Sequence, residues 1–212
     1  MFKERQRLIL LDFLERLDQA QTFDECFAAF SSATQDLGFE GAVYSFIPSP
    51  VLQQIVSFQP VFKSSGSYCP KFLQHYADAG FDKQDFTIKS ILKGSLQPMD
   101  WWAKAKTSLL TEPELEVIET AKVDYGLKNG ISIPTLSSEM GIAGASFINR
   151  DGAVTYKKLL SENLAVLRII TRTFSDRIVS DPSFSVTFLL PIFENCHQEN
   201  AKCCVTWLPA GL

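Results

Sequence analysis

The chain has 212 residues, of which 46% are hydrophobic, and a formal net charge of −4. This length and composition predict one domain with a sizeable core, and the acidic balance without a dense Lys/Arg cluster argues against direct nucleic-acid binding. No apolar run approaches the ~20 residues of a membrane span, and the start of the chain lacks a signal peptide's apolar stretch. We therefore expect a cytoplasmic protein that does not enter a membrane.

Two helices are predicted before the first strand. Residues 5–18 show the spacing of an amphipathic helix. Its apolar side is expected to carry Leu8, Leu11 and either Phe13 or Leu14. Thr22 and Glu25 form a capping box, which predicts a second helix that runs to about residue 37 and ends before a glycine.

The rest of the chain alternates short helices and strands before one long helix. Strands are predicted over 41–47, 131–135 and 143–149, short helices over 70–79, 87–92 and 113–124, and a long helix opened by Thr155 over 155–179. Residues 51–67 are expected to be a loop with at most one weak strand. The long helix should bury Leu160, Leu164, Leu167 and Ile170. This order of elements predicts an α+β fold in which an antiparallel sheet carries helices on both faces.

A strip of aromatic residues follows the predicted loop. Tyr68, Phe72 and Tyr76 are spaced by four, so they share one helix face, and Asp85 and a tryptophan pair come after them. Such a strip is typical either of an ordinary aromatic core or of a pocket for a small amphipathic ligand, which is apolar with a few placed polar groups. The spacing alone leaves both interpretations open.

The order of these residues resembles the ligand-binding region of LuxR-type quorum-sensing regulators, which bind acyl-homoserine lactones. Tyr68, Tyr76, Asp85 and Trp101 fall on matching positions, and the run HYADAGF…DFT is close to the family's HY…AGY…DPT. A second block, GLKNGISIP followed by GASF, also matches the family. The resemblance covers roughly residues 5–180 and implies an α-β-α sandwich, with the ligand held between the sheet and one helical layer.

The resemblance implies a role for each polar residue of the strip. Asp85 would accept a hydrogen bond from the ligand's amide N–H, since a buried carboxylate needs such a partner, although it could instead cap a helix. Tyr68 and Tyr76 would reach the acyl carbonyl or simply pack in the core. Thr87 and Ser132 are weaker candidates for the same polar cluster.

The remaining predicted site residues are aromatic. Trp101 would pack flat against a small ring. The family usually has Trp at the position of Phe72, and its indole N–H donates to the lactone carbonyl, so Phe72 removes a donor. Phe147 falls where some family members carry serine. The pocket should therefore be more apolar than is usual, and it could favour a long or unsubstituted acyl chain, hold the lactone loosely or prefer another ligand.

Catalysis, cofactors and metals have little support in the sequence. The chain has two histidines and lacks both a phosphate-binding loop and a nucleophile elbow. Cys196, His197, Cys203 and Cys204 fit no usual zinc spacing. We therefore expect neither an enzyme nor a metal site nor a cofactor, and a lactone hydrolase is not favoured. The expected ligand is an N-acyl-homoserine lactone.

The C-terminal tail suggests an unusual origin. We expect an autoinducer-binding domain over 1–180, and a linker and out-of-frame tail over 181–212. DNA that encodes the tail can be read in a shifted frame as Leu-Ser-Pro-Arg-Glu, like the start of the family's DNA-binding domain, which would then be absent. Such a protein would pair with itself or with a full-length LuxR-type regulator and block it. The alternative is an interaction protein that dimerises without any ligand.

Overall fold

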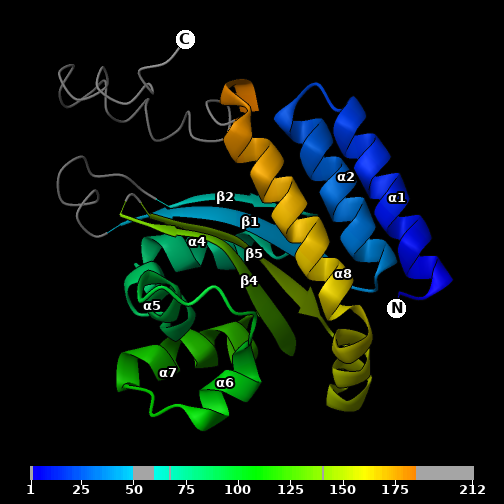
Figure 1. The fold of residues 1–212 in the computed structure, drawn as a ribbon. Coiled ribbons are helices and arrows are strands. Elements are labelled where there is room, and N and C mark those ends of the chain that lie inside the picture. The colour runs from blue at the N-terminus through cyan, green and yellow to red at the C-terminus, as the bar shows by residue number, and fades with distance from the viewer. Residues whose placement is uncertain (1, 50–59, 67, 140, 185–212) are drawn as a thin grey trace, which may run out of the picture.

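A five-stranded antiparallel sheet separates two layers of helices in the computed structural model (Figure 1). The structure describes residues 2–49, 60–66, 68–139 and 141–184. The strands lie in the order β2-β1-β5-β4-β3. Their bounds are β1 Gly41–Pro48, β2 Val61–Ser64, β3 Met99–Asp100, β4 Asn129–Ser138 and β5 Gly141–Asn149. The expected α-β-α sandwich is confirmed.

The central strands of the sheet position the residues discussed below. β4 and β5 pair with Ser132 opposite Ser146, and β1 pairs with β5 so that Val43 is also opposite Ser146. A register shift occurs in β4 just after Pro134, whose missing N–H cannot join the ladder. The two-residue strand β3 was not predicted, because it is too short to show any periodicity.

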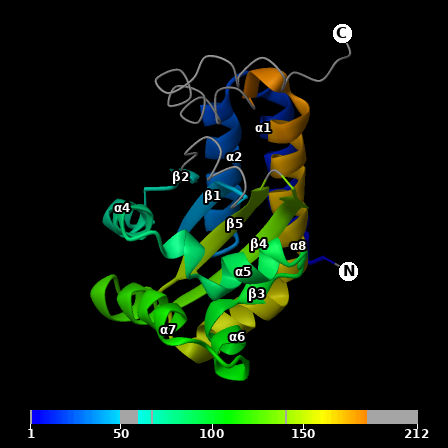
Figure 2. The same cartoon turned by 90° about the vertical axis from the view of Figure 1, so that its left-hand side faces the viewer.

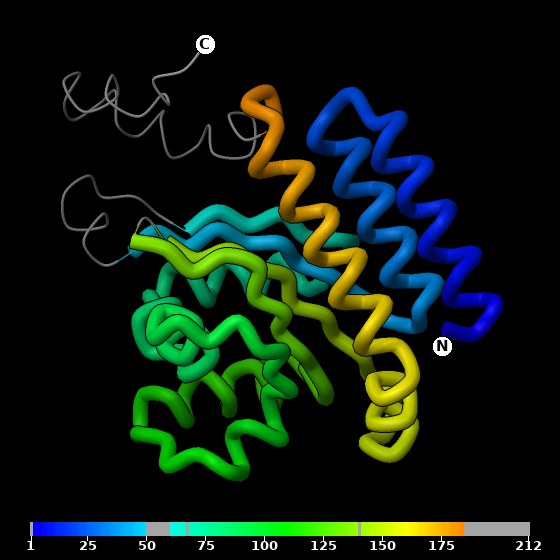
Figure 3. Tube along the Cα trace, in the orientation of Figure 1, coloured from blue at the N-terminus to red at the C-terminus, as the bar shows by residue number. Residues whose placement is uncertain are grey.

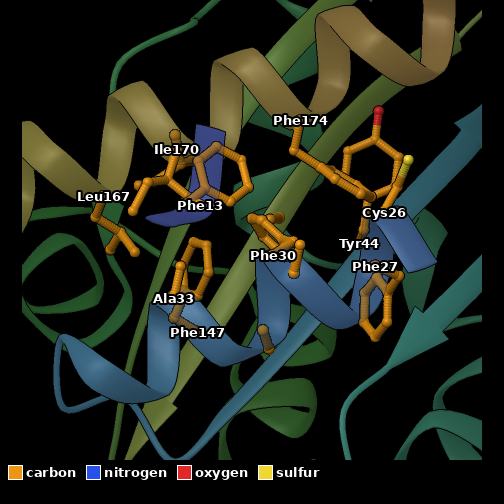
Figure 4. Packing of buried hydrophobic residues seen from close by; sticks show 14 of the residues in the cluster. Phe13, Cys26, Phe27, Phe30, Ala33, Tyr44, Phe147, Leu167, Ile170 and Phe174 are labelled. Carbon is orange, nitrogen blue, oxygen red and sulfur yellow. The ribbon is translucent and has the colours of Figure 1, made fainter. Parts of the chain in front are cut away.

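One helical layer consists of α1 Glu4–Gln19, α2 Phe23–Asp36 and α8 Ala153–Ser180 (Figure 2). α2 begins with the predicted capping box, in which Thr22 and Glu25 each bond the other's backbone N–H. Between this layer and the sheet lies the main core, where the rings of Phe30 and Phe174 stack at 4.5 Å (Figure 4). α8 begins after Gly152 rather than at Thr155.

The predicted buried side of α1 is wrong for its leucines. Phe13 and Leu17 are buried, whereas Leu8 and Leu11 are 62% and 63% exposed and Leu14 is 38% exposed. Apolar residues lie on more than one face of this helix. The face that packs against the core carries the larger Phe13 together with Leu17, which is four residues further along the chain. The leucines therefore form an exposed ridge of Leu8, Leu11 and Leu14, which we call the α1 ridge. In α8, Leu167 and Ile170 are fully buried, and Leu160 and Leu164 pack against the core, as predicted.

The other helical layer is made of shorter pieces that follow one another along the chain (Figure 3). Their bounds are α4 Pro70–Asp78, η1 Phe81–Lys83, α5 Phe86–Leu92, α6 Trp101–Thr107, α7 Glu112–Glu119 and η2 Thr120–Asp124. The helix predicted over 113–124 thus continues past α7 as a π-helical turn, and α6 was not predicted. Gly80 ends the α4 segment in the left-handed region, with φ 64°.

Two other expectations concern membranes and metals. Among the residues that the structure describes, no helix has both the length and the apolar character needed to cross a bilayer. The same residues contain no group of three or more side chains that could hold a metal ion. The tail cysteines, His197 and residues 185–212 in general lie outside the described part of the chain, as do residues 50–59.

Candidate functional site

A cavity of about 90 Å³ lies between the sheet and the layer of short helices. This volume is several times the ~10–15 Å³ that one water molecule needs, so the cavity is a pocket and not a packing defect. The structure brings all but one of the predicted site residues to its wall: Tyr68, Phe72, Tyr76, Asp85, Thr87, Trp101 and Ser132.

Phe147 is the residue that the structure does not bring to the pocket. Side chains alternate along β5, and Ser146 faces the pocket while Phe147 faces the other helical layer. There it is fully buried, with its ring 5.8 Å from that of Phe30 and 5.7 Å from that of Phe39. Its prediction as a ligand-binding residue is therefore corrected: Phe147 belongs to the core, and its neighbour Ser146 lines the pocket.

The pocket has an aromatic end and an aliphatic end. Phe72, Tyr76 and Trp101 belong to one cluster with Val43 of β1. A second hydrophobic cluster contains Ile47, Ile88, Ile91, Ile142 and Met99, and its four isoleucines also line the pocket. Val43 and Ile47 are roughly 13 Å apart along β1, because each step along a strand covers about 3.3 Å. The pocket therefore suits a ligand with a compact head and an apolar chain.

Asp85 caps a helix, which is one of the two roles considered for it, and it also lies in the pocket wall. It is the N-cap of α5, where its Oδ1 accepts hydrogen bonds of 2.7 Å from both the backbone N–H and the hydroxyl of Thr87. Its Oδ2 accepts one bond of 3.0 Å from the Tyr76 hydroxyl. Burial raises the pKa of this carboxyl, although hydrogen bonds from Thr87, from Tyr76 and from the backbone N–H of Ile88 oppose that shift. A carboxylate oxygen accepts more than one hydrogen bond, so the Oδ2 that Tyr76 contacts remains able to accept a ligand N–H.

Tyr68 supplies a second polar atom close to Asp85. Its side chain is 2% exposed, and its hydroxyl has no hydrogen bond to any residue that the structure describes. Burial, helped by the negative charge of Asp85, raises the pKa of the phenol, so it stays protonated. A protonated phenol with no partner can donate to a ligand oxygen. Tyr76 has already used its proton on Asp85.

Trp101 is held in place by the surface of the sheet. Its indole lies over Gly130, where a Cβ atom would coincide with the ring. Its Nε1–H donates to the Ser132 hydroxyl at 2.8 Å, and Ser132 shares a second bond of 2.8 Å with Ser146. Sequence reasoning missed Gly130 and Ser146 as site residues. The glycine between Asn129 and Ile131 was the available signal, since a strand glycine often marks a close approach.

Phe72 lies between the pocket and a second aromatic pair. Its ring contacts that of Tyr76 at 5.8 Å and that of Tyr125 at 5.2 Å. Tyr125 lies outside the pocket wall, and its hydroxyl bonds Nδ1 of His75 at 3.0 Å. The only histidine in the described residues is thus engaged away from the pocket.

Comparisons with known proteins agree with this geometry. The model of the autoinducer binding domain family matches residues 22–178. The chain is similar to the crystal structure of CepR2 from Burkholderia cenocepacia, an N-acylhomoserine lactone dependent LuxR family transcription factor. That match has a TM-score of 0.64 and 18% identity, and it covers 85% of this chain and 100% of that one. Escherichia coli SdiA matches with a TM-score of 0.50 and 14% identity, over 92% and 91% of the two chains. At these identities both show the shared fold. A search of curated proteins found no match.

Proposed function

Since the chain belongs to the autoinducer binding domain family of LuxR-type regulators, we propose that its pocket binds an N-acyl-homoserine lactone through Asp85. Domains of this family sense a ligand, are not enzymes and need no cofactor. The proposal goes further than the family in two respects: it names the residues that bind the ligand, and it names the partner with which the chain pairs.

The position of the Asp85 carboxylate in the pocket wall is the observation that most supports the ligand assignment. This carboxylate is half-buried in the pocket wall, and its Oδ2 accepts a bond from Tyr76. A carboxylate that is partly withdrawn from water and lines a pocket favours a ligand that carries an N–H donor. The free hydroxyl of Tyr68 lies near this carboxylate and suits the carbonyl of the same amide group. An amide therefore uses both polar atoms, one as acceptor and one as donor.

The two ends of the pocket suit the other parts of the ligand. With the amide at Asp85, the ring lies against Phe72 and Trp101 at the aromatic end. The acyl chain runs toward the isoleucines of the aliphatic end, Ile47, Ile88, Ile91 and Ile142. Thr87 holds Asp85 in place, and Ser132 holds Trp101, so both act as positioning residues in this pose.

Extraction of the purified protein tests the assignment. The chain is expressed with a mixture of acyl-homoserine lactones, purified, extracted with solvent and analysed by mass spectrometry. We expect an acyl-lactone mass at close to one equivalent per chain, and much less from the Asp85→Ala variant. A folded parent protein that retains no lactone would argue against the assignment.

A second function, pairing through the helical layer, is supported by the α1 ridge. Leu8 and Leu11 are more than 60% exposed, which is costly for apolar side chains that face water. In an antiparallel pair of α1 helices around Leu11, Arg7 of one copy faces Glu15 of the other. We propose that this ridge joins two copies, or one copy and a full-length LuxR-type regulator. An interaction protein without a ligand remains the alternative to the sensor.

Sedimentation and DNA-occupancy measurements test the pairing. The parent should sediment as a dimer, and Leu8→Gln with Leu11→Gln should shift it to a monomer without a change in lactone affinity.

We further propose that 181–212 is a linker and an out-of-frame tail. We also propose that the chain acts in the cytoplasm and that it lowers the DNA occupancy of a co-expressed regulator. Deletion of 190–212 should then leave both pairing and ligand binding intact.

A further inference from the structure

One wall of the pocket is the helical segment that runs from α7 into η2, which we call the α7–η2 segment. It lies on the side of the sheet opposite α1, α2 and α8 (Figure 1). Val117, Ile118 and Ala121 line the pocket and are at most 8% exposed. On the other side of the segment, Leu115 is 45% exposed and Val123 is 78% exposed. A single helix therefore separates this part of the pocket from solvent.

The start of the α7–η2 segment is joined to α5 by an ion pair. Nζ of Lys89 donates to Oε1 of Glu114 at 2.9 Å, and the two side chains are 39% and 11% exposed. Oε2 of Glu114 accepts bonds of 2.8 and 2.9 Å from the backbone N–H and the hydroxyl of Thr111. Lys89 follows Ile88 of the pocket wall but is not part of that wall itself. The ion pair thus ties α7 to α5 from outside the apolar lining.

The end of the α7–η2 segment is joined to α6 by a cation–π contact. Nζ of Lys122 lies 4.2 Å from the centroid of the Trp102 ring, and Trp102 also lines the pocket. Among the residues that the structure describes, no further ion pair, side-chain hydrogen bond or cation–π contact joins this segment to another helix or strand. Two contacts made by lysines, one at each end, therefore supply its polar attachment.

The chain around the α7–η2 segment is suited to movement. η2 is a π-helical turn, a rare irregularity that often occurs at functional sites. Leu109, which precedes the segment, is fully exposed, and Gly126, which follows it, has φ 63° in the region that glycine adopts without strain. The pocket side of the segment carries only small apolar side chains, so the segment can move outward without breaking a buried polar bond.

We propose that the α7–η2 segment is the lid of the pocket, and that the Lys89–Glu114 ion pair and the Lys122–Trp102 contact set how often the lid opens. Partly exposed ion pairs and cation–π contacts are weak, so each is released readily. The ligand enters and leaves while the lid is open. The identity of that ligand rests on the proposed function, whereas the opening itself requires no ligand.

Hydrogen exchange on the full chain, measured without ligand, tests the opening. Amides of residues 114–124 should exchange through a local opening, about tenfold or more faster than the amides of β5, which exchange with the core. Lys89→Met should speed the exchange of 114–124 about threefold further, as the loss of one partly exposed ion pair predicts. Lys104→Met is the matched control, because Lys104 of α6 has no ion pair or ring contact among the described residues. Equal exchange of 114–124 and β5 in the parent would overturn the proposal.

Stopped-flow kinetics with N-octanoyl-homoserine lactone tests whether the ligand passes this lid, with tryptophan fluorescence as the signal. The ion pair is present in both the closed empty protein and the closed complex. Its loss should therefore raise the association and dissociation rate constants by the same factor, about threefold, and leave Kd unchanged. A contact that only stabilises the complex would raise the dissociation rate constant alone and so raise Kd. That result for Lys89→Met would contradict the proposal.

A second variant and the two readouts separate this inference from the proposed function. Lys122→Met keeps an apolar contact with the Trp102 ring but removes the charge, so it should also speed both rate constants. If the parent binds no lactone, the proposed function fails, and hydrogen exchange still decides whether the lid opens. Local opening together with rate constants that neither lysine variant changes would show that the ligand uses another route, which would overturn the proposal.

Discussion

The Tyr76 hydroxyl donates to Oδ2 of Asp85 at 3.0 Å, and this bond joins α4 to the beginning of α5. Asp85 thereby serves the fold and the pocket together, since its other oxygen caps α5 through Thr87. The bond also fixes the direction of the remaining acceptor site on Oδ2. A variant that keeps the helix cap but loses the charge of Asp85 therefore separates its role in the fold from its proposed role in the pocket.

Asp85→Asn should weaken lactone binding more than it weakens the fold. Asparagine caps helices about as well as aspartate does, so α5 should keep its beginning. The charged acceptor is lost, which predicts a loss of about 1.5–3 kcal/mol in binding free energy. Calorimetry measures the affinity and urea unfolding the stability. An affinity equal to that of the parent would show that Asp85 does not hold the amide.

Lactone affinity should fall as the pH is lowered. Burial raises the pKa of Asp85 above its ordinary value of 3.8. The protein without ligand therefore has a contribution to its folding stability that is present below pH 3.8 and is lost as the pH rises through the raised pKa.

A ligand N–H bonded to Asp85 favours the charged carboxylate and so lowers its pKa again. Binding should thus release a proton at pH values between the pKa of Asp85 in the complex and its raised pKa in the ligand-free protein, which calorimetry in two buffers detects. Asp85→Asn is the control, and a pH-dependent proton release that persists in it would contradict this prediction.

Gly130→Ala should disrupt the pocket through Trp101. The new methyl group coincides with the indole, so the ring must move and leave its bond to Ser132. We expect at least a tenfold loss of lactone affinity and a change in tryptophan fluorescence, since the indole leaves its packed site. Gly152→Ala, where a Cβ meets nothing, is the matched control. Parent-like affinity and fluorescence in Gly130→Ala would show that Trp101 is not held in this way.

Phe30→Ala should destabilise the protein without changing the pocket. Phe30 is fully buried, and it stacks on Phe174 at 4.5 Å in the core on the far side of the sheet. Removal of a buried phenylalanine side chain costs about 3–5 kcal/mol of unfolding free energy. Urea unfolding should show this loss, while the folded fraction binds lactone with the affinity of the parent. A loss below about 1 kcal/mol would mean that the core is less tightly packed than described here.

Periodicity and capping signals predicted most of the fold. The capping pair Thr22 and Glu25, the prolines in the first turns of α4 and α7 and the alternation in β5 are local features, so the sequence carries them directly. The exposed side of α1 could not be predicted, because leucines and Phe13 lie on different sides of the helix and only tertiary packing selects between them. α6 was missed because contacts far along the chain hold its tryptophans: Trp101 packs on β4, and Trp102 donates to the backbone carbonyl of Lys128 just before β4.

The polar residues of the site were predictable from their order, and their supports were not. Asp85, Tyr76 and Trp101 were chosen from one continuous strip of sequence. Ser146 and Gly130 come from β5 and β4, and only the register of the sheet brings them to Trp101 and Ser132. Phe147 was misplaced by one position, because a one-residue shift along a strand changes the face of the sheet.

Thermal melting of the purified chain with acyl-homoserine lactones of short to long acyl chains tests the central claim most directly. A ligand that binds only the native state stabilises it by mass action, by about 2.7 kcal/mol at a hundredfold excess over Kd. The account predicts a saturable rise in melting temperature for at least one lactone, and a smaller rise for Asp85→Asn at the same concentration. No shift with any lactone of the panel, in a parent protein that melts cooperatively, would contradict it.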